Sequence, residues 1–325
     1  MKHCLHRLRN EQGVILIVVM MTVAIMAIIA VGLMEEVRFS LRLSTNAGTY
    51  DQERWYALDM EPWAQAQLAA VNKDKKAVTF QPIKQNYSLD GMQLIARLVP
   101  LSNCFNLNSL IATKDGKEQP SAQATRLYGR LLSGLGVSPE RAADLIAALE
   151  DWIDSDTELR PGGAEDYEYS GLAIPYRTGN TRLDDVSELK SIKGYDASLY
   201  NRLQPFVCTL PAATPLVLDI NSLTRADARL VDAVFDASPA QDPVEVILNA
   251  RPAEGFADIK DLWKTPDLAS IGIKEEDKAL LTVKPHYFLL HTTVTQGDIQ
   301  LVAESAYSKA KDAQAHLLWR RIGEE

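Results

Sequence analysis

The chain has 325 residues and a formal net charge of −9, with 46% hydrophobic and 24% charged residues. This composition predicts a folded protein long enough for two domains, and it is unlike that of a disordered chain. Sequence-independent nucleic-acid binding needs clustered excess Lys and Arg, which this acidic balance opposes, and three cysteines with five histidines leave little material for a Cys/His metal cluster.

The most apolar part of the chain is an uncharged run from Val14 to Met34. About 20 such residues in a helix match the ~30 Å hydrocarbon core of a bilayer. Lys and Arg precede the run, and Glu35 and Glu36 follow it, so the run predicts a single transmembrane helix with a cytoplasmic N-terminus. A cleaved signal peptide is the alternative, but its apolar region spans only about 7–15 residues and ends in a small-x-small site.

A glycine, Gly13, stands between the polar residues 1–13 and the apolar run. Because glycine has no side chain, a peptidase can approach the backbone closely there. This arrangement resembles the leader of type IV prepilins and pseudopilins. The resemblance implies cleavage after Gly13 by a prepilin peptidase and methylation of the new amine at Val14.

The fifth residue after this cleavage point is Val18. Major pilins and pseudopilins carry a glutamate there, and that carboxylate pairs in the bilayer with the terminal amine of an adjacent subunit. In lacking it, the chain resembles the K-type minor pseudopilins of type II secretion. The resemblance implies a subunit at the apex of the pseudopilus, with no neighbour above it.

Residues 35–71 continue the helical pattern, and Pro62 within them predicts a kink or a break. Strands are predicted over 79–83 and 92–101, joined by a turn at residues 89–91, and again over 286–294 and 299–307. The order of elements predicts an α+β fold with a long N-terminal transmembrane helix and a pilin-like antiparallel sheet head carrying a large inserted all-α domain. The predicted divisions are leader 1–13, transmembrane helix 14–34, pilin-like domain 35–110 plus 285–325, and inserted helical domain 111–284.

Within the insertion, residues 125–150 are amphipathic, and Ser138-Pro139 marks a new helix start. Two sequence echoes also occur in this region, 106–110 with 219–223 and 186–190 with 256–262. Such repeats resemble helix-hairpin-helix modules, some of which bind DNA. A membrane-anchored DNA-binding protein of an uptake apparatus is therefore an alternative function, although the surrounding acidity favours a scaffolding role.

Carboxylates are densest in DWIDSDTE (151–158) and GAEDYEY (163–169). From composition alone, a solvated acidic loop and a calcium site explain this cluster equally well, since calcium takes 6–8 oxygen ligands. These two segments, with IPYR (174–177) and Asn180, resemble the core motif of K-type pseudopilins, whose helical domain binds calcium. The resemblance implies calcium ligands at four residues, with two further candidates: Asp154, Asp156, Glu165 and Asp166, then Asp151 and Glu188.

Paired carboxylates also serve in glycoside hydrolysis, so a membrane-anchored hydrolase is a competing interpretation. The sequence contains no G-x-S-x-G, H-E-x-x-H or G-x-x-x-x-G-K-[ST] motif. We therefore expect no enzymatic activity.

After loss of the leader, Cys104 and Cys208 are the two remaining cysteines. In an oxidising compartment two thiols make one disulfide the default expectation. The sequence does not show whether their Cα atoms come within bonding reach.

The resemblance also implies the partners and the role. The partners would be the minor pseudopilins of the I and J types, the major pseudopilin, the prepilin peptidase and the inner membrane, and no nucleic acid. The head would lie in the periplasm. The role would be to cap the type II secretion pseudopilus and start its assembly, in support of the export of folded proteins across the outer membrane.

Overall fold

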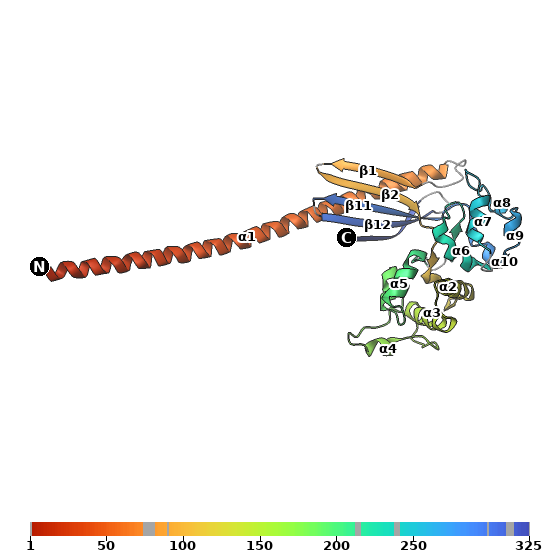
Figure 1. Cartoon of the computed structure of the whole chain (residues 1–325), viewed down its shortest axis with the longest axis horizontal. Coiled ribbons are helices and arrows are strands. Elements are labelled where there is room, and N and C mark those ends of the chain that lie inside the picture. The colour runs from red at the N-terminus through yellow and green to blue at the C-terminus, as the bar shows by residue number, and fades with distance from the viewer. Residues whose placement is uncertain are drawn as a thin grey trace.

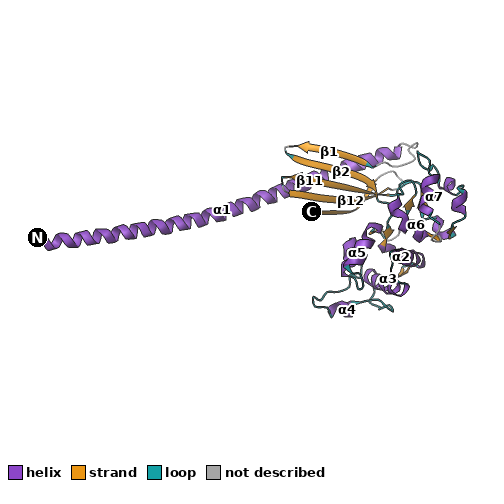
Figure 2. Cartoon of the chain, in the orientation of Figure 1, coloured by secondary structure: helices purple, strands orange, loops and turns teal. Residues whose placement is uncertain are grey.

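The computed structural model describes residues 2–73, 82–89, 91–211, 216–236, 241–297, 299–309 and 315–324, with the backbone alone for 2–13, 71–73, 236, 269 and 324. Figure 1 shows three parts in a row: a long N-terminal helix, a sheet packed along the end of that helix, and a helical part beyond the sheet. Figure 2 shows that strands dominate the middle part and short helices with loops the last.

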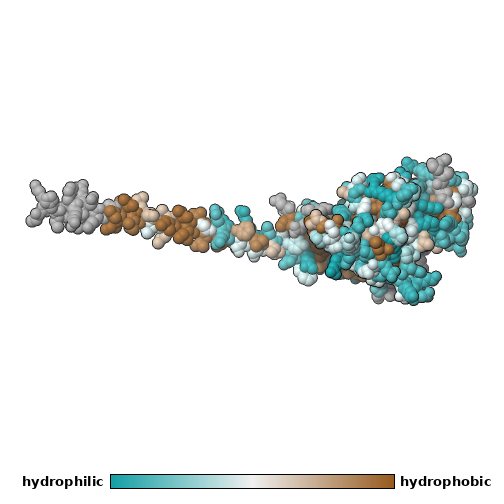
Figure 3. All heavy atoms as spheres, turned by 90° about the horizontal axis from the view of Figure 1, so that it is seen from below, coloured by the Kyte–Doolittle hydropathy of each residue, from teal (hydrophilic) through white to brown (hydrophobic). Residues whose placement is uncertain are grey.

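The long helix is α1 (Lys2–Lys73). All of its side chains from Val14 to residue 48 are exposed in the isolated chain, and Figure 3 shows the apolar ones as a brown band along the rod. It is the one helix in the described residues that is long and apolar enough to cross a membrane. Such an exposed apolar surface fits a lipid or helical environment.

The helix continues through Pro62, so of the kink or break predicted at this residue the break is wrong. Proline removes one backbone hydrogen bond, which by itself favours a kink. Here apolar side chains on both sides of Pro62 are buried against the sheet and hold the helix in place; they are Ala57, Met60, Ala64 and Leu68.

The sheet is antiparallel and has the strand order β1-β2-β11-β12-β13. Its strands are β1 (Ile83–Leu89), β2 (Met92–Pro100), β11 (Tyr287–Gln296), β12 (Ile299–Lys309) and β13 (Ala315–Glu324). Strands β2, β11 and β12 correspond to the predicted ones. The predicted strand 79–83 lies largely outside the described residues; the observed β1 begins at Ile83 and runs up to the turn. Strand β13 was not predicted.

Alternate residues of β2 are buried, and they face α1 across one apolar core. That core also takes in Phe288, Leu290, Leu301 and Tyr307 from β11 and β12. The two long β segments, 82–100 and 287–309, are distant in the chain but adjacent in the sheet, because β2 pairs with β11 from Met92↔Gln296 to Pro100↔Phe288. The intervening residues therefore leave the sheet at the end of β2 and return to it at the adjoining start of β11.

These intervening residues form the helical part (residues 103–284), which has its own apolar core from Phe105 to Leu281. Phe105, Leu107 and Leu110 belong to that core, so the predicted boundary at 110/111 falls a few residues late. The longer helices are α2 (Ala122–Gly134), α3 (Pro139–Ile153), α5 (Ala197–Leu203), α6 (Ala228–Val234) and α7 (Pro243–Ala250), and the one-turn helices are α4 (Asp166–Ser170), α8 (Ile259–Leu262), α9 (Pro266–Ala269) and α10 (Glu275–Lys278). As predicted, Ser138 caps the new helix, accepting a bond from the Arg141 amide.

The helical part is built from two similar units, each closed by a short parallel strand pair. In the first unit β3 (Phe105–Asn106) pairs with β6 (Val207–Cys208), and in the second β7 (Leu218–Asp219) pairs with β10 (Leu281–Thr282). The sequence echo at 106–110 and 219–223 lies at the start of the two units. The remaining elements are the hairpin β4 (Ile111–Lys114) and β5 (Lys117–Pro120), the pair β8 (Phe235–Asp236) and β9 (Gly272–Ile273), and the 3-10 turns η1 (Leu107–Leu110), η2 (Val186–Ser191), η3 (Gln204–Phe206) and η4 (Arg225–Asp227).

Candidate cation site

The acidic residues singled out in the sequence begin at the C-terminal end of α3. Asp154 caps that helix, donating its amide to the Glu150 carbonyl at 3.1 Å. The chain then leaves the helix in an extended loop and turns back at residues 161–162 before α4. Because both arms of this loop meet at the end of α3, carboxylates eleven residues apart come together.

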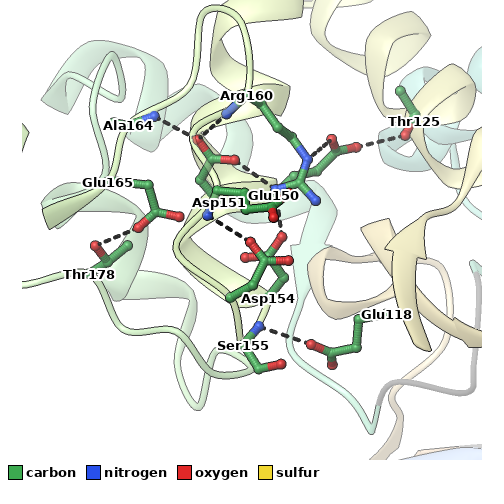
Figure 4. A network of polar contacts seen from close by, with 12 residues as sticks. Glu118, Thr125, Glu150, Asp151, Asp154, Ser155, Arg160, Ala164, Glu165 and Thr178 are labelled. Atoms are coloured by element: carbon green, nitrogen blue, oxygen red, sulfur yellow. Dashed lines mark hydrogen bonds and ion pairs between the residues drawn. The ribbon is translucent and has the colours of Figure 1, made fainter. Parts of the chain in front are cut away.

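Three carboxylates form what we call the cation cluster: Asp154, Asp156 and Glu165. Each offers one oxygen, and these oxygens lie within 4.8 Å of one another. Asp154 is 1% exposed and Glu165 is 7% exposed. Among the described residues no donor reaches Asp154 Oδ1 or Glu165 Oε1. Figure 4 shows both side chains, one on each arm of the loop that follows α3.

Such buried oxygens without donors are costly unless a cation or water satisfies them. Burial raises the pKa of Asp154, and the ion pair with Arg160 opposes this rise only in part. Burial likewise raises the pKa of Glu165, against the opposing hydrogen bond from Thr178. The cluster therefore holds more negative charge than its protein surroundings stabilise. Hard cations such as calcium prefer oxygen ligands of this kind, so the residues present fit that group.

Asp166, the fourth ligand implied by the resemblance, lies beside the cluster but has protein partners. Its Oδ1 accepts bonds from the amide and the hydroxyl of Thr178, both at 2.9 Å. These bonds lower the pKa of Asp166. The same Thr178 hydroxyl lies 3.1 Å from Glu165 Oε2, so Thr178 links the two carboxylates.

The two further candidates, Asp151 and Glu188, are used for loop structure. Asp151 is fully buried and binds Arg160 and the Ala164 amide. Glu188 Oε1 accepts from the amides of Asp184 and Asp185 and so completes the capping box of η2. Neither belongs to the group of oxygens brought within 4.8 Å.

Two residues near the cluster were missed by sequence reasoning. Arg160 is the one cation between Asp151 and Glu168, and this isolation was a usable signal. Glu118 gave no signal, because it lies on β5, far back in the chain. Its carboxylate accepts the Ser155 amide at 2.9 Å and pairs with Arg182 at 3.1 Å, which ties the start of the loop to the segment that precedes η2.

The remaining predicted sites lie away from the loop. A disulfide joins Cys104 and Cys208, with their Cα atoms 5.7 Å apart, directly beside the β3–β6 pair. Gly13, Val14 and Val18 lie within α1, with the Val18 side chain 55% exposed. The helix thus carries no carboxylate between Val14 and Met34.

Comparison with known proteins gives matches along nearly the whole chain. Two family models, both described as "Type II secretion system (T2SS), protein K", match residues 103–212 and 218–284, which are the two units of the helical part. The chain is 33% identical to the type II secretion system protein K of Pectobacterium carotovorum subsp. carotovorum, covering 89% of this chain and 90% of that one. It is 32% identical to the protein of the same name from Aeromonas hydrophila, covering 97% and 98%.

A solved structure is also similar. It is the GspK-GspI-GspJ complex from the type 2 secretion system of enterotoxigenic Escherichia coli. The matched chain has a TM-score of 0.72 and 29% identity, covering 87% of this chain and 99% of that chain. The similarity therefore includes the sheet and the helical part together.

Proposed function

This chain belongs to the type II secretion system protein K family of minor pseudopilins, and we propose that it forms the tip of the periplasmic pseudopilus and starts its assembly. One feature carries the proposal: an apolar helix with Val18 in place of the glutamate that pairs a pilin subunit with its neighbour. A carboxylate in the bilayer is costly without a partner. A subunit with no neighbour above it has no partner for such a carboxylate, so it gains nothing from keeping the carboxylate.

The head supports the same position. In Figure 1 the sheet and the helical part are much broader than the rod, and they lie at the end opposite the membrane segment. A head of this breadth would prevent another subunit from stacking above it. Subunits added below would still reach α1, whose side chains are exposed from Val14 to residue 48.

We further propose that the partners of α1 are minor pseudopilins of the I and J types, with the major pseudopilin below them. The similar solved structure is itself a GspK-GspI-GspJ complex. Beyond the membrane segment, α1 keeps exposed apolar side chains at Phe39, Leu41 and Leu43. Packing against other helices would bury this surface.

The proposal includes the membrane topology and the processing of the chain. Lys2, Arg7 and Arg9 precede the apolar run, which favours an N-terminus in the cytoplasm and a head in the periplasm. The prepilin peptidase would cut between Gly13 and Val14 on that cytoplasmic side and methylate Val14. The role is structural rather than enzymatic, and the DNA-binding alternative is not favoured by the family.

The cation cluster is proposed to bind calcium through Asp154, Asp156 and Glu165. The unpartnered oxygens of Asp154 and Glu165 support this assignment. A bound calcium ion would supply positive charge to a loop that connects α3 to the rest of the first unit. Its role would be to stabilise the head.

The tip position is tested by labelling the protein at a cysteine introduced in an exposed loop of the head and counting copies along isolated pseudopili. One copy at one end, lost when the I or J subunit is absent, is the expected result. Copies distributed along the shaft would contradict the proposal. A second test replaces Val18 with Glu: secretion that improves with the glutamate would also contradict it.

Calcium binding is tested with the full-length chain in detergent. Chelation should lower the melting temperature, because a ligand that binds only the native state stabilises it by about 2.7 kcal/mol at 100 times its Kd. Asp154→Asn should abolish the calcium-dependent shift, and the exposed control Glu254→Gln should keep it. A wild-type protein whose melting temperature ignores calcium does not have this site. An activity lost in Asp154→Asn with unchanged calcium content would instead favour the hydrolase interpretation.

A further inference from the structure

We infer that Arg160 and Asp151 are positioning residues for the calcium site: they orient Asp154 and Glu165 towards the cation without contacting it. The inference rests on the calcium site proposed above. Four residues carry it, and all of them lie in α3 or in the loop that follows, as Figure 4 shows.

Arg160 forms an ion pair with one oxygen of Asp154 and leaves the other free for a cation. Its Nη1 lies 2.5 Å from Asp154 Oδ2 in an ion pair. The other oxygen, Oδ1, is buried and has no donor among the described residues. An aspartate held by one oxygen keeps its second oxygen in a defined direction, which is what a ligand for a hard cation requires.

Asp151 holds Arg160 from the other side. The same Nη1 is 2.7 Å from Asp151 Oδ1, so one nitrogen bridges two carboxylates one helical turn apart. The Arg160 backbone amide also donates to Asp151 Oδ2 at 3.3 Å. Both the main chain and the side chain of Arg160 are thus tied to the last turn of α3.

Asp151 also positions Glu165. Its Oδ2 accepts the amide of Ala164 at 3.0 Å, and Ala164 directly precedes Glu165. Asp151 is 0% exposed, and both of its oxygens already accept hydrogen bonds. These bonds make Asp151 an anchor for the returning arm of the loop rather than a ligand.

The charges support the same division of roles. Arg160 Nε lies 3.6 Å from Glu150 Oε2, so a single guanidinium faces three carboxylates of α3 and its cap. The positive charge of Arg160 therefore compensates chiefly the negative charges of Glu150, Asp151 and Asp154. In the part of the chain that the structure describes, no Lys or Arg pairs with Asp156 or Glu165, and their charge is left for a divalent ion.

The alternative role for Arg160 is that of a competitor, whose positive charge repels calcium. The two roles predict opposite effects when the charge is removed. A competitor's removal tightens calcium binding, whereas loss of a positioning residue behind a metal ligand typically weakens binding by about 10–100-fold.

The test is calcium titration of the full-length chain in detergent, with melting temperature measured in parallel. We expect Arg160→Met and Asp151→Asn each to weaken calcium binding by at least about tenfold. Arg160→Lys should lie between them and the wild type, because an ammonium can pair with Asp151 and Asp154 but lacks the fork that also reaches Glu150. The matched control is Arg225→Met, which breaks an exposed ion pair with Glu245 in the second unit and should leave the calcium Kd unchanged.

An unchanged or lower Kd in Arg160→Met overturns the inference, even if the variant melts earlier, because a purely structural role moves stability and not affinity. If Arg160→Met does not fold, Arg160→Lys decides by the same criterion. If the wild-type protein binds no calcium, the proposed calcium site is itself contradicted. That result is distinct from a wild type that binds and variants that bind equally well.

Discussion

Asn108 and Asn221 occupy equivalent positions in the two units of the helical part and make the same three hydrogen bonds. Asn108 Oδ1 accepts the Leu183 amide, and its Nδ2 donates to the carbonyls of Leu183 and Leu210. Asn221 Oδ1 accepts the Phe256 amide, and its Nδ2 donates to the carbonyls of Phe256 and Val283. In each unit one asparagine therefore joins the first turn to two later segments.

Loss of this asparagine should destabilise the head. In Asn108→Ala, three buried backbone groups lose their partner, and each unsatisfied group costs about 1–3 kcal/mol. Because water can enter in part, we expect a total loss of about 2–4 kcal/mol in the free energy of unfolding. Urea unfolding of the full chain measures it. Asn201→Ala, on the exposed side of α5, should change stability by less than about 0.5 kcal/mol. Equal effects of the two substitutions would contradict the assignment.

Gly163 should be intolerant of a side chain. A Cβ there would lie 2.0 Å from Asp151 Oδ2 and 3.1 Å from the Arg160 carbonyl. Gly163→Ala must therefore push the loop away from Asp151, at a cost of about 1–3 kcal/mol, with weaker calcium binding. Gly171→Ala is the matched control, since its nearest neighbour, the Glu168 carbonyl, is 3.6 Å away. Thermal melting with and without calcium compares the two. A Gly163→Ala protein that behaves like Gly171→Ala would show that the loop does not depend on this contact.

Calcium binding should weaken on acidification, and it should do so at a higher pH than for a site built from carboxylates of ordinary pKa. Burial raises the pKa of Asp154 above 3.8 and that of Glu165 above 4.5. Protons compete with calcium for the same oxygens, so the calcium Kd should rise as the pH falls towards these raised values. The calcium-induced melting shift at pH 5 should then be smaller than at pH 7.5.

Without calcium the sign reverses. A carboxyl group with a raised pKa in the folded state favours folding when it is protonated, and this contribution is lost as the pH rises through that pKa. In EDTA, the contribution of Asp154 and Glu165 to stability should therefore be greater at pH 5 than at pH 7.5. Asp154→Asn should reduce this dependence. A calcium shift that grows as the pH falls would contradict the first expectation, and an Asp154→Asn protein with an unchanged pH dependence in EDTA would contradict the second.

The disulfide should stabilise the head through the unfolded state. Cys104 and Cys208 are separated by 104 residues, and the chain-entropy model gives about 4 kcal/mol for a loop of that length. The double substitution Cys104→Ala/Cys208→Ala should lower the urea midpoint accordingly, and reductant should then have no further effect. Cys4→Ser is the control, and its urea midpoint should still respond to reductant. A double variant as stable as the wild type would contradict a stabilising role for the bond.

Features that depend on local chemistry could be predicted from the sequence. The uncharged run of 14–34 identified the apolar segment by its length. Ser138-Pro139 indicated the start of α3, and the carboxylates of DWIDSD indicated the position of the acidic loop. Each of these signals lies within about 20 neighbouring residues, where helix geometry and residue type suffice. The absence of an acid at Val18 is equally readable, because it is a property of one position.

Which acids act together follows from tertiary contacts. Asp151, Asp156 and Asp166 are similar in sequence, yet Asp151 anchors Arg160, Asp156 joins the cation cluster, and Asp166 binds Thr178. Pro62 likewise failed to break α1, because packing against the sheet outweighed its local preference. These outcomes depend on contacts between segments far apart in the chain, and such contacts follow from the folded arrangement rather than from neighbouring residues.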